Sequence, residues 1–247
     1  MKKLQDWIIP DREASGIVDI LREWENKHSE VLSLVPNKGL VVQAGGYVGV
    51  FPKNLSYFFT KVITFEPVEE NWDCLTKNIQ EKNILKINAG LGNCTGKAKI
   101  KKIIPNNCGA IQLESEEDGD ISIVCLDDYI FEQVDLLWLD IEGYEVKALQ
   151  GAKNTIKKYT PVIVLENNGL IPEFPGSLDG SIELRSWMKE VFGYSFVKRI
   201  MRDDIFIYKG QIMTQTDLNL DTKEESPYNG LFWCWYRKEF FSGQSTL

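Results

Sequence analysis

The sequence predicts an α/β fold built on a mostly parallel, seven-stranded sheet that ends in an antiparallel hairpin. Short apolar runs alternate with longer amphipathic stretches between residues 40 and 165, and strands buried on both faces of a parallel sheet have this continuous apolar character. Further along, two strand-like segments, 194–200 and 205–208, flank the polar turn 201–204. That arrangement predicts a hairpin at the end of the sheet.

Strands and helices are expected to alternate along the middle of the chain. The apolar runs place strands at 40–44, 62–65, 84–88, 134–139 and 161–165. The stretches between them place helices at 49–59, at 68–82 and from about residue 140 to about residue 159. Two more strands, at 97–104 and 121–126, are expected around a polar, acidic loop at 114–120.

The alternating region, residues 39–210, is expected to form the main domain, with a different segment at each end. Residues 1–38 are expected to form an N-terminal helical cap, because apolar residues recur at helical spacing over 15–34 and Ser15 can cap that helix. Residues 211–247 are polar at first and then rich in aromatic rings. We expect this C-terminal tail to pack on the domain, with a partner surface or a wall of the substrate pocket as the alternatives.

Length, charge and cysteine content restrict the possible functions. The 247 residues suffice for one well-buried domain, and the net charge of −8 repels polyphosphate, so no broad nucleic-acid surface is expected. The five cysteines are scattered without a C-x-x-C pair, which favours free thiols in a reducing compartment. No apolar run is long enough to predict a membrane span, and the N-terminus is not typical of a signal peptide. We therefore expect a cytoplasmic protein.

A nucleoside cofactor is predicted by the residues that follow the first three strands. The first strand ends in the glycine turn 43–49, whose backbone can approach a ligand and whose following helix offers free N–H groups. Glu66 ends the second strand, where an acid can accept hydrogen bonds from ribose hydroxyls. The loop 87–92 after the third strand is expected to border an adenine ring. The expected cofactor contacts are Gln43, Ala44, Gly45, Gly46, Gly49, Glu66, Pro67, Asn88, Ala89 and Asp140.

A nicotinamide-dependent oxidoreductase is the first alternative. The A-x-G-x-x-G pattern at 44–49, followed by Glu66, nearly fits a dinucleotide-binding fingerprint. However, the pair Tyr57 and Lys61 falls at the end of the first helix of the domain, which is the wrong part of the fold for hydride transfer. The terminal hairpin is instead typical of a Rossmann-like class I methyltransferase.

Residues 137–152 carry the most specific motif of the chain. They include Asp140-Ile141-Glu142-Gly143 and resemble the D-x-E-G-x-E-x-x-x-L-x-G-A signature of the FkbM-type methyltransferase family. Residues 65–67 and 161–166 are also similar to family segments and occur in the right order. The resemblance covers residues 40–209. It implies methyl transfer from S-adenosylmethionine, commonly to a hydroxyl oxygen of a sugar or a natural product.

One position departs from the family pattern. The family usually has an aspartate where this chain has Gln43, and an acid there helps to hold the amino-acid end of the cofactor. The neutral amide of Gln43 can still form hydrogen bonds but lacks the charge, at a cost on the order of 1 kcal/mol. This departure is the reason to keep a second alternative, a cofactor-binding or partner-binding protein without catalysis.

Carboxylates at strand ends are the candidate catalytic groups. Methyl transfer to a hydroxyl needs alignment, exclusion of water and a group that takes the proton. We expect Asp140 near the methyl-donor pocket, Glu142 as the base or as a group that orients the substrate, and Glu166 as a second polar wall. The single histidine, His28, precedes the domain and is expected to be a surface or helix residue. Glu145 is expected to be a solvated helix residue.

The acceptor and a possible metal are less constrained by the sequence. Asp140, Glu142 and Glu166 could together hold Mg²⁺ or Ca²⁺, but nothing in their spacing requires a metal, and none is predicted. The expected acceptor is a small molecule or a carbohydrate. Residues 103–120 and 167–182 are expected to shape its pocket, because loops around strand ends carry specificity.

Overall fold

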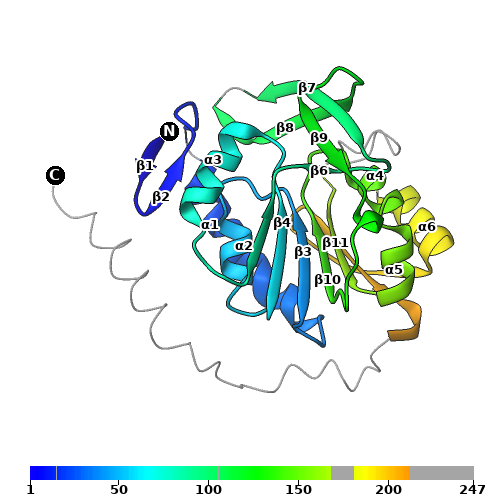
Figure 1. Cartoon of the computed structure of the whole chain (residues 1–247). Coiled ribbons are helices and arrows are strands. Elements are labelled where there is room, and N and C mark those ends of the chain that lie inside the picture. The colour runs from blue at the N-terminus through cyan, green and yellow to red at the C-terminus, as the bar shows by residue number, and fades with distance from the viewer. Residues whose placement is uncertain (15, 105, 168–180, 212–247) are drawn as a thin grey trace, which may run out of the picture. The chain divides into compact units, whose positions relative to one another are not determined.

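The computed structural model describes residues 1–14, 16–104, 106–167 and 181–211, which belong to one compact unit, residues 1–211 (Figure 1). Three predictions fall wholly or partly outside these residues: the capping role of Ser15, the packing of the C-terminal tail, and the part of the expected acceptor loop at 168–180.

The central sheet has the predicted parallel core and antiparallel end. Its strands are β3 (Leu40–Ala44), β4 (Lys61–Phe65), β5 (Ile84–Ile87), β10 (Leu136–Leu139), β11 (Val162–Glu166), β12 (Tyr194–Ile200) and β13 (Asp203–Tyr208). They lie in the order β12-β13-β11-β10-β3-β4-β5. All neighbouring pairs from β11 to β5 are parallel, and β13 is antiparallel to both β11 and β12. Along the chain, β4 and β5 are added on one side of β3, and β10 and the later strands are added on the other side. The boundary between β3 and β10 is the place where ligands bind in such folds.

Helices cover both faces of this sheet, which explains why its strands are apolar throughout. The helices are α1 (Gly16–Ser33), α2 (Val50–Leu55), α3 (Glu69–Asn78), α4 (Glu145–Gln150), α5 (Lys153–Tyr159) and α6 (Ser181–Phe192), with short 3₁₀ turns at Leu126–Asp128 and Lys209–Gln211. On one face, Trp24 of α1 and Phe51 of α2 pack on Trp138 of β10, with ring centroids 6.3 and 5.3 Å apart. On the other face, Leu149 of α4 and Leu184 of α6 belong to the main apolar cluster.

The helical stretch expected up to about residue 159 is present and consists of two helices, α4 and α5. The break falls at Gly151 and Ala152. A Cβ atom at Gly151 would lie 1.9 Å from the carbonyl oxygen of Gly92. The chain turns here because the backbone of another loop packs directly against it.

A second, four-stranded sheet lies over the carboxyl ends of the central strands, at the top of Figure 1. Its strands are β6 (Gly90–Leu91), β7 (Gly96–Ile104), β8 (Asn107–Ser115) and β9 (Ile121–Val124), in the order β6-β9-β7-β8. The strands expected at 97–104 and 121–126 correspond to β7 and β9. Strand β8 was missed, and the acidic loop expected at 114–120 begins within it. Its sequence lacks a clear alternation, and it is a strand because it pairs with β7, for example Ile111 with Ile103.

The N-terminal segment is not only helical, which corrects the expected cap at residues 1–38. Two short antiparallel strands, β1 (Lys2–Leu4) and β2 (Trp7–Ile9), precede α1. The side chain of Asn78, at the end of α3, accepts a hydrogen bond from the N–H of Ile8 and donates one to its carbonyl, both at 2.8 Å. These hydrogen bonds between the Asn78 side chain and the backbone of β2 fix the strand pair to the domain. The sequence of residues 2–9 alone gives no signal for them.

Two predictions about the whole chain can be compared with the described residues. Within them, Cys74, Cys94, Cys108 and Cys125 are free thiols, as expected. No helix in this part of the chain combines the length and the apolar character that crossing a membrane requires.

Candidate active site

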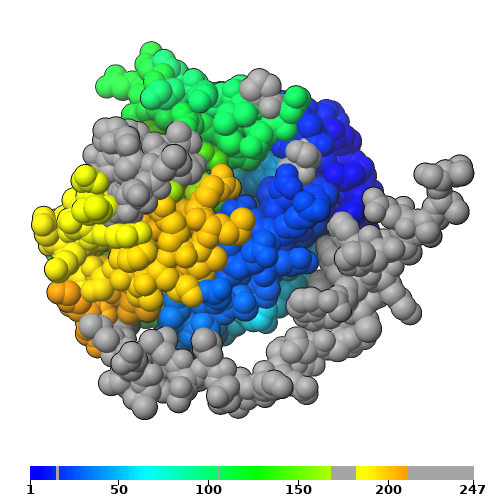
Figure 2. Space-filling model, turned by 180° about the vertical axis from the view of Figure 1, so that it is seen from behind, coloured from blue at the N-terminus to red at the C-terminus, as the bar shows by residue number. Residues whose placement is uncertain are grey.

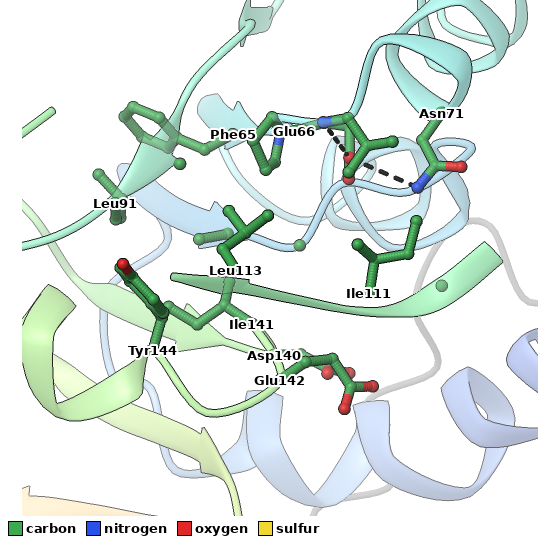
Figure 3. Close-up of a pocket in the computed structure, with 16 residues that line it drawn as sticks. Phe65, Glu66, Asn71, Leu91, Ile111, Leu113, Asp140, Ile141, Glu142 and Tyr144 are labelled. Carbon is green, nitrogen blue, oxygen red and sulfur yellow. Dashed lines mark hydrogen bonds between the residues drawn. The ribbon is translucent and has the colours of Figure 1, made fainter. Parts of the chain in front are cut away.

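A narrow pocket lies at the carboxyl ends of β3, β4 and β10, beneath β8 (Figure 3). Six of the residues proposed from sequence line it: Ala44, Gly45, Glu66, Pro67, Asp140 and Glu142. The wall that faces them comes from β8, through Gly109, Ile111 and Leu113, and sequence analysis named this segment only as the range 103–120. The remaining lining residues are Phe65, Val68, Asn71, Gly90, Leu91, Ile141 and Tyr144. The cavity has a volume of about 50 Å³, which is small for a ligand site of at least roughly 300 Å³.

The glycine turn packs directly against the loop that carries Asp140. Gly45 has a positive φ of 88°, and a Cβ atom there would lie 1.9 Å from the carbonyl oxygen of Asp140. The N–H groups of Gly45 and Gly46 both donate to the carbonyl of Phe65, at 3.1 and 2.9 Å. Glycine is required at position 45 because only a residue without a side chain fits this conformation and this close approach.

Gln43 does not line the pocket, although sequence analysis proposed it as a cofactor contact. Its side chain is buried between β3 and β4. Its amide nitrogen donates to the carbonyls of Gly45 (2.8 Å) and Ala44 (3.2 Å), and its amide oxygen accepts from the Thr64 hydroxyl at 2.5 Å. A carboxylate has no hydrogen to donate to those carbonyls. The amide thus holds the glycine turn in place, which accounts for glutamine at this position.

Four other proposed contacts also lie outside the pocket lining. Gly46 is packed against Leu75, and Gly49 precedes α2 and leaves room for Ile79. Asn88 is exposed and donates to the carbonyl of Glu66 at 3.1 Å. Ala89 is buried just before β6. These four residues support the shape of the loops, and their direct contact with a cofactor stays a prediction.

Glu66 is the buried acid of the pocket. One of its oxygens accepts the N–H of Tyr47 at 2.7 Å, and the other accepts the N–H of Val68 at 2.9 Å. Asn71 lies 3.5 Å from the second oxygen (Figure 3). Burial raises the pKa of Glu66 to about 7, against the effect of these donors. Each carboxylate oxygen has two lone pairs, so the group can accept further hydrogen bonds from a ligand in the pocket.

The three carboxylates proposed as catalytic residues lie together. Asp140 and Glu142 follow β10 and Glu166 ends β11, and one oxygen of each lies within 4.8 Å of the others. Of the three, Asp140 and Glu142 line the pocket and Glu166 does not. Glu142 has a left-handed backbone with a φ of 54°, a conformation that is costly for a residue other than glycine and that often occurs at functional sites.

The surroundings of Glu166 favour its protonated form. Burial raises its pKa to about 11, and the charges of Asp140 and Glu142 and a hydrogen bond with Asp140 add to the effect. Arg202, whose guanidinium lies 3.1 Å from Glu166, opposes it. A protonated carboxyl donates a hydrogen bond and cannot take a proton. Two of the three proposed groups, Asp140 and Glu142, are therefore left as candidate bases.

This group of carboxylates has the ligand type that Mg²⁺ and Ca²⁺ prefer. A cation bound to all three would have to displace the proton of Glu166 and compete with Arg202. Both requirements disfavour a metal.

A series of ion pairs connects α1 with the start of β13 and with the turn before it. Arg202 also lies 3.3 Å from Glu23, and Lys27 lies 2.5 Å from Glu23 and 2.8 Å from Asp203. The side chains of Lys27 and Asp203 are fully buried. The N-terminal helix is thus joined electrostatically to the strand end that carries Glu166.

His28 lies on α1, as expected, and does not line the pocket. Its ring stacks on Trp24, and its Nδ1 lies 2.8 Å from the Trp24 carbonyl oxygen. The histidine therefore has a packing role on the helix.

Glu145 was expected to be solvated, and this prediction was wrong. Its side chain is buried, and its carboxylate accepts the N–H groups of Ile141 and Gly143, both at 3.0 Å. The side chain folds back over the loop before α4 and fixes the segment that carries Glu142. Burial raises the pKa of Glu145 to about 8.

We expect the stability of the protein to fall as pH rises from about 5 to about 8. The folded-state pKa of Glu145 lies above its usual value near 4.5, so the folded chain binds more protons in this range and the free energy of unfolding decreases with pH. Urea denaturation at several pH values measures this slope. Glu145→Gln should make it shallower, whereas Glu69→Gln, at an exposed position of α3, should leave it unchanged. Identical slopes in the native chain and Glu145→Gln would contradict the assignment.

The strand order, the glycine turn and the acid at the end of the second parallel strand define a class I methyltransferase fold. The profile of the Methyltransferase FkbM domain matches residues 43–196, which is more than half of the chain. The chain belongs to the FkbM methyltransferase family, as the motif at 137–152 predicts. This family depends on S-adenosylmethionine.

Solved structures with a similar fold share little sequence with this chain. A methyltransferase FkbM from Methylobacillus flagellatus KT is 18% identical, with 69% of this chain and 44% of that chain covered and a TM-score of 0.47. Magnesium protoporphyrin IX methyltransferase from Synechocystis PCC 6803, with bound S-adenosylmethionine, is 14% identical over 80% of this chain and 86% of that chain, with a TM-score of 0.45. No curated protein sequence matches the chain.

Proposed function

We propose that this chain transfers a methyl group from S-adenosylmethionine to a hydroxyl oxygen of a small molecule or a carbohydrate. The observation that carries the proposal is the buried carboxylate of Glu66, which lines the pocket and accepts a hydrogen bond from the glycine turn. An acid at the end of the second strand of a doubly wound fold is placed to bind ribose hydroxyls. The match to the FkbM family over residues 43–196 supports the same class of reaction.

The residues of the pocket suit the parts of this cofactor. Glu66 would accept hydrogen bonds from the ribose, and Leu91, Ile111 and Leu113 would border the flat, apolar face of the adenine. Asp140 would lie near the amino-acid end, beside the backbone of Gly45. Because the cavity encloses only about 50 Å³, binding requires the pocket to widen.

In this mechanism the bound cofactor supplies an electrophilic methyl group. Glu142 accepts the proton of the acceptor hydroxyl, while the protonated Glu166 donates to Asp140 and fixes its orientation. Water is excluded by the apolar side chains of β8 above the pocket. The carboxylates at 140 and 142 repel anions, so neutral, hydroxyl-bearing acceptors are favoured over phosphorylated or acidic ones.

Calorimetric titration with S-adenosylmethionine tests the cofactor site. The native chain should bind, and Glu66→Gln should bind about 10- to 150-fold more weakly, because a hydrogen bond to a charged group contributes roughly 1.5–3 kcal/mol. The matched control is Glu69→Gln, which removes an exposed carboxylate from the first turn of α3. Equal affinity of the native chain and Glu66→Gln would remove Glu66 from the site. Absence of binding to the native chain would end the proposal.

A further inference from the structure

Glu13 is a buried acid that lies outside the residues matched by the FkbM family. Its side chain is 1% exposed, and it precedes α1, whereas the family match begins at residue 43. The next residue, Ala14, donates its N–H to the carbonyl of Asn106 at 3.2 Å. The N-terminal segment therefore runs beside the start of β8, and Figure 2 shows the N-terminal residues (dark blue) against the second sheet (green).

The carboxylate of Glu13 joins two walls of the proposed cofactor site. Its Oε2 accepts the hydroxyl of Tyr47 at 2.8 Å and the N–H of Cys108 at 2.7 Å. Tyr47 belongs to the glycine turn, and Cys108 belongs to β8, the strand that covers the pocket. A single buried group thus fixes the distance between the turn and the strand.

The same contacts continue to Glu66 from both sides. Tyr47 donates its N–H to Glu66 at 2.7 Å. Asn71 donates to the carbonyl of Cys108 at 2.9 Å and lies 3.5 Å from Glu66. Starting from Glu13, the hydrogen bonds therefore pass through Tyr47 to Glu66 and return through Asn71 and Cys108, forming a closed ring around the carboxylate that would bind the ribose.

Tyr47 is the critical member of this ring, because it contacts both acids. It has a left-handed φ of 47° and is buried, a conformation that persists only where surrounding contacts impose it. Without Glu13, the Tyr47 hydroxyl and the Cys108 N–H would both lose their acceptor in a buried place. The turn would then relax and release Glu66 from one of its donors.

We propose that Glu13 is a positioning residue for ribose recognition, acting through Tyr47 on Glu66, so that the N-terminal segment is part of the cofactor site. This inference rests on the proposed binding of S-adenosylmethionine. It assigns a role in ligand selectivity to a segment that precedes the region matched by the family.

Titration with S-adenosylhomocysteine and with its 2′,3′-dideoxy analogue tests the inference. The ratio of their dissociation constants measures how strongly the ribose hydroxyls are recognised. We expect the native chain to prefer the natural ligand by tens of fold and Glu13→Ala to reduce that ratio several-fold. Tyr47→Phe keeps the aromatic side chain, removes only the hydroxyl that Glu13 accepts, and should lower the ratio in the same way. It therefore gives the answer if Glu13→Ala does not fold. Glu25→Gln, at an exposed position of α1, is the matched control and should keep the native ratio.

Each outcome is decisive. A lower ratio in Tyr47→Phe supports the proposal when Glu13→Ala also has a lower ratio or does not fold, and a folded Glu13→Ala with the native ratio overturns it. An unchanged ratio in the variants overturns it, even if both ligands bind more weakly, because uniform weakening indicates a structural role alone; the proposed function then stands. Failure of the native chain to bind S-adenosylhomocysteine overturns both proposals.

Discussion

Glu142→Gln is expected to reduce methyl transfer by roughly 10²- to 10⁴-fold, the usual contribution of a general base, while S-adenosylmethionine still binds with nearly native affinity. Glu142 lines the pocket beside Asp140, and its left-handed backbone places it at the turn after β10. The glutamine side chain has the same shape but cannot accept a proton. Release of S-adenosylhomocysteine in the presence of neutral mono- and disaccharides and phenols measures the loss.

Two variants define the specificity of this effect. Glu166→Gln should cause a smaller loss than Glu142→Gln, because the amide resembles the protonated carboxyl that burial imposes at Glu166. Glu132→Gln, at an exposed position before β10, should leave turnover unchanged. If Glu142→Gln turned over at the native rate on the acceptor found, the proton would have to pass to another group, and Asp140 would be the remaining candidate.

Those parts of the site that lie at strand ends could be predicted from the sequence. Gly45, Glu66 and Asp140 directly follow or end apolar runs, and parallel strands bring their carboxyl ends to one edge of a sheet. The parallel core and the antiparallel end of the sheet could also be predicted, because apolar runs alternate with amphipathic stretches and a hairpin pattern follows them. The local pattern of apolar residues was sufficient to predict a site residue wherever its position depends only on the strand that it ends or follows.

Residues whose role depends on distant partners could not be predicted. Ile111 and Leu113 reach the pocket because β8 pairs with β7, and Glu13 is buried because Tyr47 and Cys108 supply its donors. In the same way, the position of Glu145 suggests a solvated helix residue, yet backbone N–H groups of the loop before α4 donate hydrogen bonds to its carboxylate. A charged side chain in an amphipathic stretch has no local signal that distinguishes exposure from burial with a partner.

Lys27→Met is expected to cause the largest loss of stability, about 3–5 kcal/mol, which corresponds to a fall in Tm of about 6–20 °C for a chain of this size. The ammonium of Lys27 lies 2.8 Å from Asp203, and neither side chain is exposed. Methionine fills the space of the lysine stem but leaves the carboxylate of Asp203 buried without its cation. Thermal and urea denaturation of both proteins measure the difference.

The double variant Lys27→Met/Asp203→Leu separates the loss of charge pairing from the loss of packing. Replacing both members of a buried ion pair by apolar residues is often neutral, so the double variant should regain much of the lost stability.

Burial raises the pKa of Asp203 to about 7 even with Lys27 nearby. The folded protein therefore takes up a proton there as pH falls below about 7. The deficit of Lys27→Met should then shrink towards pH 5 and grow towards pH 8, because a protonated Asp203 has no charge left to pair. A deficit independent of pH, with no recovery in the double variant, would mean that Lys27 contributes through packing rather than through its charge.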